Sequence, residues 1–319
     1  MIVLTGAAGF IGSVFLKKLN NMGHNDVIIV DNLAESVKWK NLIGKNFTTY
    51  YNKEHFLEII EGGDLSNSIE AIFHLGACSS TTELNMDYLI INNLNYSKFL
   101  CEYALEYGIP FHYASSAATY GLGENGFSDK FFDNLKPLNP YGYSKYLFDK
   151  WLLDNELLDK VTGYKYFNVF GPNEYHKGNM ASMIFKSYHQ ILEKGQVNLF
   201  KSNNSKYSDG GQIRDFIYVK DIVEVMYKFY QKDIKGIYNL GTGVKKSWND
   251  LASAVFNALG KDVKINYIDM PENIKGQYQN FTLADMKKFN RVLDYKFMTF
   301  EDSVTDYVQN YLVKEWQFI

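Results

Sequence analysis

The sequence has few cysteines, little net charge and no long hydrophobic run. Its two cysteines, Cys78 and Cys101, argue against a disulfide scaffold and suit a reducing compartment. Neither has a second cysteine at zinc-binding spacing, so we expect no metal site. With 33 basic and 36 acidic residues, the net charge of −3 gives no support to a nucleic-acid-binding surface.

The N-terminal residues and the apolar runs bear on location. The chain opens on an apolar strand pattern without a basic leader or a cleavage site, so we expect no signal peptide. No apolar run approaches the length of a membrane span. These features favour a cytoplasmic enzyme that binds neither nucleic acid nor a membrane. A length of 319 residues with 46% hydrophobic content suits two domains around a sizeable core.

Short apolar runs alternate with longer amphipathic stretches, which predicts an α/β fold with a Rossmann-type doubly wound parallel sheet and a smaller mixed α/β substrate domain. The cofactor domain is expected at residues 1–168 with about 214–238, and the substrate domain at 169–213 and 239–319. Residues 201–212, rich in Asn, Ser, Gly and Lys, predict a flexible loop. The expected strands are 2–4, 27–30, 71–75, 111–114, 164–167 and 238–240, and the expected helices are 11–22, 56–60, 88–107, 141–153 and 221–230.

A glycine-rich turn joins the first expected strand to the first helix. Gly6 allows a tight turn, Gly9 lets the backbone approach a pyrophosphate, and Gly12 permits close packing of helix on strand. The helix N-terminus then offers free N–H groups and a partial positive charge to the phosphates. Since an acid also ends the second strand, the pattern predicts a bound nicotinamide dinucleotide.

The residues after the second strand bear on which dinucleotide binds. Asp31 is placed to accept from the adenine ribose hydroxyls, which favours NAD. Asn32 follows, and Lys38 and Lys40 come a few residues later. A lysine at Lys38 could neutralise a 2′-phosphate, so NADP stays open. A solvated surface lysine is the alternative role for Lys38.

Tyr141 and Lys145 predict the reaction chemistry. Their spacing places both side chains on one face of a helix, where the ammonium lowers the pKa of the phenol. Tyr141 can then act as general base toward a hydroxyl that loses a hydride to nicotinamide, while Lys145 holds the nicotinamide ribose. A surface pair on an amphipathic helix is the alternative. Hydroxyls at the end of a predicted strand favour catalysis, with Ser116 as the expected donor to the reacting oxygen and Thr119 as the second choice.

Together these motifs resemble the extended short-chain dehydrogenase/reductase superfamily, which includes nucleotide-sugar epimerases and dehydratases. Within it, the segments 74–82, 114–121, 166–172, 176–182 and 238–243, with Arg214-Asp215-Phe216, resemble the ADP-L-glycero-D-manno-heptose 6-epimerase family. The segment His-Lys-Gly-Asn-Met-Ala-Ser at 176–182 is the distinguishing one, since most sugar epimerases lack it. The resemblance spans nearly the whole chain.

The resemblance implies inversion of C6 of an ADP-heptose, a step in the synthesis of lipopolysaccharide inner-core precursors. The sugar is oxidised to a transient 6-keto intermediate and reduced again by the same tightly bound NADP, with NAD as the alternative. Inversion needs acid–base groups on both faces of the ketone, and the resemblance assigns Tyr141 and Lys177 to them. Neutralising a substrate phosphate is the alternative role for Lys177. The resemblance also implies a homo-oligomer, with a pentamer suspected.

Binding residues also follow from the resemblance. The planar guanidinium of Arg214 matches a diphosphate oxygen pair, although a surface ion pair with Asp215 is the alternative. The residues toward the cofactor are Gly6, Gly9, Phe10, Ile11, Gly12, Asp31, Asn32, Lys38, Lys53, Leu75, Gly76, Ala77, Cys78, Ser79, Asn92, Lys145, Val169 and Lys177. The residues toward the substrate are Asn168, Asn179, Lys186, Phe200, Arg214 and Tyr278.

Two other functions compete with this one. Another nucleotide-sugar enzyme, a 4-epimerase or a 4,6-dehydratase, is the first. A dehydratase would need an acid pair beside the strand-end hydroxyl, where this sequence has Ala117 and Ala118. A non-catalytic dinucleotide-binding regulator is the second, but such proteins often lose the tyrosine or the lysine that this chain keeps.

Overall fold

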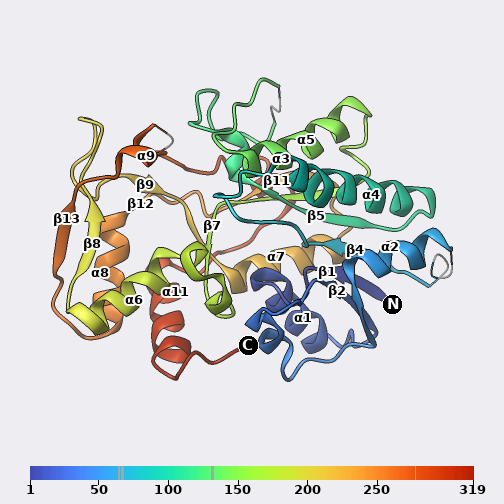
Figure 1. Ribbon diagram of the computed structural model, residues 1–319, viewed down its shortest axis with the longest axis horizontal. Helices are drawn as coiled ribbons and strands as arrows, with labels where there is room; N and C mark the ends of the chain where they lie inside the picture. Colours follow the sequence, from blue (N-terminus) through green and yellow to red (C-terminus); the bar gives the residue numbers. More distant parts are fainter. Residues whose placement is uncertain (64, 66–67, 131–132, 277) are drawn as a thin grey trace.

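A seven-stranded parallel sheet forms the centre of the computed structural model, which describes residues 1–319 except 64, 66–67, 131–132 and 277 (Figure 1). The strand order is β11-β6-β5-β4-β1-β2-β3, so the order reverses between β1 and β4. The predicted doubly wound sheet is confirmed, and such sheets bind ligands at the carboxyl ends of the strands beside this reversal. The strands are β1 Ile2–Thr5, β2 Val27–Asp31, β3 Thr49–Asn52, β4 Ala71–His74, β5 Phe111–Ser116, β6 Thr162–Tyr166 and β11 Gly236–Leu240.

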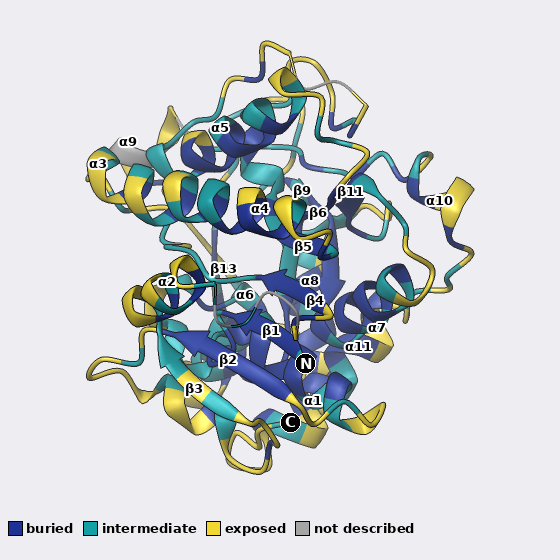
Figure 2. Cartoon of the chain, turned by 90° about the vertical axis from the view of Figure 1, so that its right-hand side faces the viewer, coloured by how far each residue is buried: buried dark blue, intermediate teal, exposed yellow. Residues whose placement is uncertain are grey.

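Helices cover both faces of this sheet, as the strand burial requires. In β1, Ile2 and Leu4 join the core beneath α1 and α7, whereas Val3 joins the core beneath α2, α4 and α5. All residues of β1, β2 and β4 are buried, and they form the dark centre of Figure 2. The helices are α1 Phe10–Asn21, α2 Lys53–Glu61, α4 Tyr96–Glu106, α5 Pro140–Asp154 and α7 Val219–Gln231.

Most of the elements outside this sheet and its covering helices gather beside the carboxyl ends of the strands, where β8, β13, α6, α8 and α9 lie on the left in Figure 1. Three two-stranded sheets pair β7 with β10, β9 with β12, and β8 with β13. Their strands are β7 Asn168–Phe170, β8 Val197–Phe200, β9 Ile213–Arg214, β10 Phe216–Tyr218, β12 Lys246–Ser247 and β13 Ile265–Ile268. The helices there and nearby are η4 Tyr175–Met180, α6 Met183–Lys194, α8 Trp248–Ala258, α9 Glu272–Lys275, α10 Phe289–Val292, α11 Phe300–Tyr307 and η5 Val308–Leu312.

Several predicted elements differ from those observed. The single helix expected at 88–107 is α3 (Met86–Leu89), a π-helical turn η2 (Ile90–Asn95) and α4. The strand expected at 164–167 is β6, which begins two residues earlier and ends at Tyr166, whereas β3 and β7 were not predicted. Residues 239 and 240, placed in the substrate domain by the sequence, complete β11 of the central sheet. The division into two domains stays a prediction.

The predicted loop at 201–212 is present, and the helices can also be compared with the length of a membrane span. The segment 201–212 is a loop tied to α8, because Asn249 donates from its backbone to the Gly210 carbonyl and from its side chain to the Asp209 carbonyl. Within the described residues, no helix is both long and apolar enough to cross a membrane.

Candidate active site

A cavity of about 940 Å³ brings the predicted catalytic residues together at the carboxyl end of the sheet. Ser116, Tyr141, Lys145 and Lys177 all line it, although they come from β5, α5 and η4. A smaller pocket of about 170 Å³ adjoins it, since both are lined by Gly6 and by other residues of the β1 and β4 ends. The topology therefore assembles one site from segments that are far apart in the sequence.

All residues predicted to face the cofactor line one or both of these spaces. Those lining both are Gly6, Asp31, Lys38, Gly76 and Ala77. Those lining only the large cavity are Gly9, Phe10, Ile11, Gly12, Leu75, Ser79, Lys145, Val169 and Lys177, and those lining only the smaller pocket are Asn32, Lys53, Cys78 and Asn92.

Five of the six predicted substrate residues also line the large cavity, namely Asn168, Asn179, Lys186, Arg214 and Tyr278. Phe200 is not among the lining residues. Its ring instead packs edge-on against Tyr278, with centroids 6.3 Å apart. Phe200 therefore contacts a residue of the cavity wall without lining the cavity itself.

The glycine turn leaves the start of α1 open to an anion. Gly6 has a φ of +68°, and a Cβ there would lie 2.6 Å from the Gly76 nitrogen. A Cβ on Gly12 would lie 2.1 Å from the Gly6 carbonyl oxygen. Gly9 is the N-cap and adds no side-chain cap, so the first N–H groups of α1 stay available. This cradle fits the pyrophosphate of a dinucleotide.

Asp31 and two lysines shape the smaller pocket. Asp31 accepts from the Ala8 backbone N–H at 2.8 Å and from the Lys38 ammonium at 2.6 Å. Lys53 donates to the side chain of Asn92. Two ammonium groups therefore line the pocket in which the adenosine end of a dinucleotide is expected.

Asn93 connects the cofactor loop after β4 to α5, and sequence reasoning missed it. Its side chain accepts from the Cys78 N–H at 2.8 Å, and donates to the Cys78 carbonyl at 3.0 Å and to Ser144 Oγ at 2.9 Å. Asn93 is fully buried within the π-helical turn η2. The sequence shows only two consecutive asparagines, and the local winding decides that Asn93 is the inward one.

Local sequence explains why α5 begins beside Ser116. Asn139 caps the helix by accepting from the Gly142 N–H at 2.8 Å, and Pro140 occupies the first helical position. A Cβ on Gly142 would lie 2.8 Å from the Ala118 carbonyl, so glycine allows the close approach of α5 to η3, residues 117–120. This approach brings Tyr141 close enough to Ser116 for the serine side chain to affect the pKa of the phenol.

The electrostatics of the Tyr141–Lys145 pair correct one prediction. We expected the ammonium to lower the pKa of the phenol, but burial raises the pKa of Tyr141, and the neighbouring Ser116 side chain opposes this only in part. Lys145 donates to the Ala114 carbonyl at 2.8 Å, and burial lowers its pKa to about 8. Burial therefore sets the direction of both pKa shifts, and the phenol stays protonated at neutral pH.

Lys177 enters the cavity on a loop that Glu174 holds in place. The buried Glu174 carboxylate accepts two hydrogen bonds from Ser182, one from the backbone N–H at 2.6 Å and one from the hydroxyl at 2.8 Å. The Lys177 ammonium lies 5.8 Å from the centre of the Phe10 ring. Burial lowers the pKa of Lys177, against the charge of Glu174. A partly desolvated lysine of this kind can exchange a proton more readily than a surface lysine.

Arg214 lies between two aromatic rings on the substrate side. Its guanidinium carbon is 5.1 Å from the Trp248 ring centre and 5.3 Å from that of Tyr278, and Trp248 donates to the Tyr278 hydroxyl at 2.8 Å. Asp215 is occupied elsewhere, since it accepts from the N–H and hydroxyl of Thr242. The alternative of a surface Arg214–Asp215 ion pair is therefore wrong. Sequence reasoning missed Trp248, because no sequence motif marks this residue and only the folded structure places it beside Arg214.

Comparisons with known proteins show the family to which this chain belongs. The family described as the NAD dependent epimerase/dehydratase family matches residues 2–241. A relative from Nitratidesulfovibrio vulgaris (strain DP4), named ADP-L-glycero-D-manno-heptose-6-epimerase, is 50% identical over 100% of both chains. A relative of the same name from Fusobacterium nucleatum subsp. nucleatum is 46% identical, also over 100% of both chains. The predicted resemblance is thereby confirmed.

The solved structures include a close match in fold. The crystal structure of Helicobacter pylori ADP-L-glycero-D-manno-heptose-6-epimerase has a TM-score of 0.81 and 29% sequence identity. The match covers 97% of this chain and 95% of that one. The similarity therefore includes both the central sheet and the elements that close the cavity.

Proposed function

We propose that this chain, which belongs to the NAD dependent epimerase/dehydratase family, inverts C6 of an ADP-heptose, converting the D-glycero form to the L-glycero form. The product serves lipopolysaccharide inner-core synthesis. The observation that carries the proposal is the large cavity, which Tyr141 and Lys177 both line from separate elements, beside the dinucleotide cradle. Two independent acid–base groups suit an inversion, because one group cannot readily serve both faces of a fixed ketone.

The chain's residues would hold a dinucleotide along the β1, β2 and β4 ends. The first turn of α1 would bind the pyrophosphate, and Lys145 would bind the nicotinamide ribose. Lys38 and Lys53 would meet a 2′-phosphate, which supports NADP over NAD. When bound, the nicotinamide would accept a hydride from the sugar and later donate it back. Because the hydride returns to the sugar in each cycle, no external reductant is consumed.

Tyr141 and Lys177 divide the proton chemistry in this proposal. Tyr141 removes a proton from, or returns one to, the sugar hydroxyl at its Oη, with the Ser116 hydroxyl orienting the same oxygen. Lys177 does so at its Nζ when the sugar presents its other face. Because the Tyr141 phenol is protonated in the free chain, it is suited first to donate and must be deprotonated before it acts as base.

The substrate side suits an ADP-sugar with its diphosphate on Arg214. The Trp248 and Tyr278 rings hold the guanidinium in one orientation, so little side-chain entropy is lost on binding. A dehydratase is less well supported. Among the described lining residues the acids are Asp31 and Glu174, and both are engaged in hydrogen bonds away from Ser116.

The proposal is tested by incubating the purified protein with ADP-D-glycero-D-manno-heptose without added reductant. The expected result is formation of the L-glycero epimer, with UDP-sugars left unchanged at C4. No interconversion, or 4-epimerisation of a UDP-sugar instead, would contradict it. The homo-oligomer, the pentamer and the cytoplasmic location stay predictions.

A further inference from the structure

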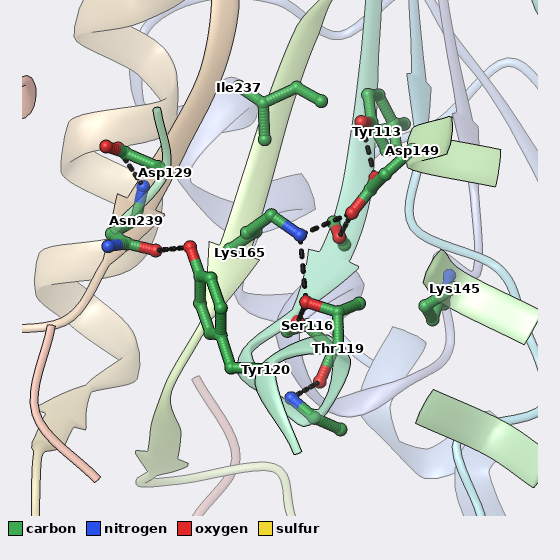
Figure 3. A network of polar contacts seen from close by, with 12 residues as sticks. Tyr113, Ser116, Thr119, Tyr120, Asp129, Lys145, Asp149, Lys165, Ile237 and Asn239 are labelled. Atoms are coloured by element: carbon green, nitrogen blue, oxygen red, sulfur yellow. Dashed lines mark hydrogen bonds and ion pairs between the residues drawn. The ribbon is translucent and has the colours of Figure 1, made fainter. Parts of the chain in front are cut away.

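A buried ion pair lies beneath the catalytic edge and joins two elements of the site (Figure 3). Asp149 follows Tyr141 by two turns of α5, and Lys165 lies in β6. Their charged atoms are 2.5 Å apart, and both side chains are 0% exposed. The same carboxylate accepts from the Tyr113 hydroxyl at 2.8 Å and the Ser115 hydroxyl at 2.7 Å, both in β5.

This pair reaches Ser116 through one hydroxyl. Lys165 donates to Thr119 Oγ1 at 2.9 Å, and that hydroxyl donates to the Ser116 carbonyl at 2.8 Å. The Ser116 hydroxyl accepts from the Ala118 N–H at 3.1 Å and lines the same cavity as Tyr141. A chain of hydrogen bonds therefore runs from Asp149 on α5 through β6 and η3 to Ser116, which lines the cavity together with Tyr141.

Asp149 also bears on the charge of Lys145, which precedes it by one turn. Burial lowers the pKa of Lys145, and Asp149 is the main group that opposes this, with Cys78 acting in the same sense. His74, also close to Lys145, is neutral because burial lowers its pKa to about 3. Stability alone gives a weak reason for such a pair, since apolar residues of similar volume stabilise a core at least as well.

We propose that Asp149 and Lys165 are positioning residues of this active site. The pair fixes the strand end that carries Ser116 against the helix that carries Tyr141, and its carboxylate keeps the Lys145 ammonium charged. This inference rests on the proposed function, in which Ser116 and Tyr141 act on the sugar and Lys145 holds the nicotinamide ribose.

The double variant Asp149→Asn/Lys165→Met tests the charge. It removes both charges at similar volume, so it is expected to fold. NADPH affinity is measured at a series of pH values from the fluorescence of the bound NADPH. The pH at which half of the affinity is lost should be about one unit or more lower in the double variant than in the wild type. The kcat for the sugar should fall about 10- to 100-fold at neutral pH, with KM within about threefold. Unchanged pH dependence with unchanged kcat would overturn the inference.

Thr119→Val tests the positional link separately. It removes the hydroxyl bridge but keeps the Asp149 charge, so kcat should fall while the pH dependence of NADPH binding stays that of the wild type. Thr119→Ser should restore kcat, and failure to do so would contradict the link. Asp154→Asn, which breaks the exposed pair with Lys150 on the same helix, should change neither quantity. A wild type that binds NADPH but converts no sugar would contradict the proposed function, and the NADPH titrations would still decide the charge role of Asp149.

Discussion

The Lys38 ammonium lies 2.6 Å from Asp31 Oδ1 at the mouth of the smaller pocket. Asp31 also accepts from the Ala8 N–H, so this carboxylate is already partnered in the free chain. An isolated acid at the end of β2 would repel a 2′-phosphate. The neighbouring ammonium removes that repulsion and can itself pair with the phosphate. The relationship between these two residues is the basis of the proposed preference for NADP.

Replacing Lys38 should change the choice of cofactor. In Lys38→Met we expect the Kd for NADPH to rise about 10-fold or more, because one charge-assisted contact is lost. The Kd for NADH should change much less. Lys40→Met, an exposed neighbour in the same short helix η1, Val37–Leu42, is the matched control. Fluorescence titration with both dinucleotides checks this, and equal weakening of the two would contradict the role of Lys38.

Removing the phenol of Tyr141 should stop the reaction without emptying the cofactor site. In Tyr141→Phe, kcat should fall about 100- to 10,000-fold, because proton transfer at the sugar hydroxyl is lost. NADPH affinity should stay within about threefold of the wild type. Tyr143→Phe changes an exposed tyrosine on the same helix and should be silent. If both variants behave alike, Tyr141 is not the acid–base group.

Lys177 distinguishes an acid–base role from a phosphate-binding role. In Lys177→Met we expect one epimer still to reduce the bound NADP, because one face keeps its acid–base group, but no inverted product to form. Absorbance of reduced nicotinamide measures the oxidation of the sugar, and analysis of the sugar product measures the inversion. If Lys177 only neutralises a phosphate, KM should rise while inversion continues at saturating substrate.

The pH profile should report Lys145. Burial lowers the pKa of Lys145 to about 8, and the ammonium is the form that can hold the ribose. Affinity for NADPH should therefore be high below pH 8 and fall as the pH rises through that value. Titrations at a series of pH values check this. Constant affinity up to about pH 10, near the ordinary pKa of lysine, would contradict it.

Two buried histidines should make the fold sensitive to acid. His74 is hydrogen-bonded to Thr5 and Ser97, and His112 to Tyr164. Burial lowers the pKa of both from 6.5 to about 3. The unfolded chain therefore takes up protons below pH 6.5 that the folded chain refuses, and stability falls as the pH drops from 6.5 toward 3. By pH 5 we expect a loss of about 2 kcal/mol per histidine, measured by urea unfolding. In His112→Phe the loss by pH 5 should be smaller than in the wild type by about 2 kcal/mol, the contribution of that histidine.

The sequence predicted those parts of the site that local spacing determines. Gly6, Gly9 and Gly12 act within one turn, and Tyr141 and Lys145 within one helical face, so the printed order of residues is enough. The cavity assembled from β5, α5 and η4 was predicted only through the family resemblance, since no local pattern brings Lys177 to Ser116.

Other parts required the three-dimensional arrangement. Lys165 in β6 meets Asp149 in α5 because β6 lies beside β5 and α5 packs on β5, an arrangement that no spacing encodes. The raised pKa of Tyr141 comes from burial, and the position of Phe200 behind Tyr278 comes from tertiary packing. Patterns of charge alone therefore gave the wrong sign for the phenol.

The central claim is that one bound nicotinamide removes a hydride from C6 and returns it to the opposite face. The most direct measurement is conversion of ADP-D-glycero-D-manno-heptose in D₂O, with the C6 hydrogen of the product followed by NMR and mass spectrometry. The account predicts the L-glycero epimer with protium retained at C6. Deuterium at C6, or no epimer at all, would contradict it.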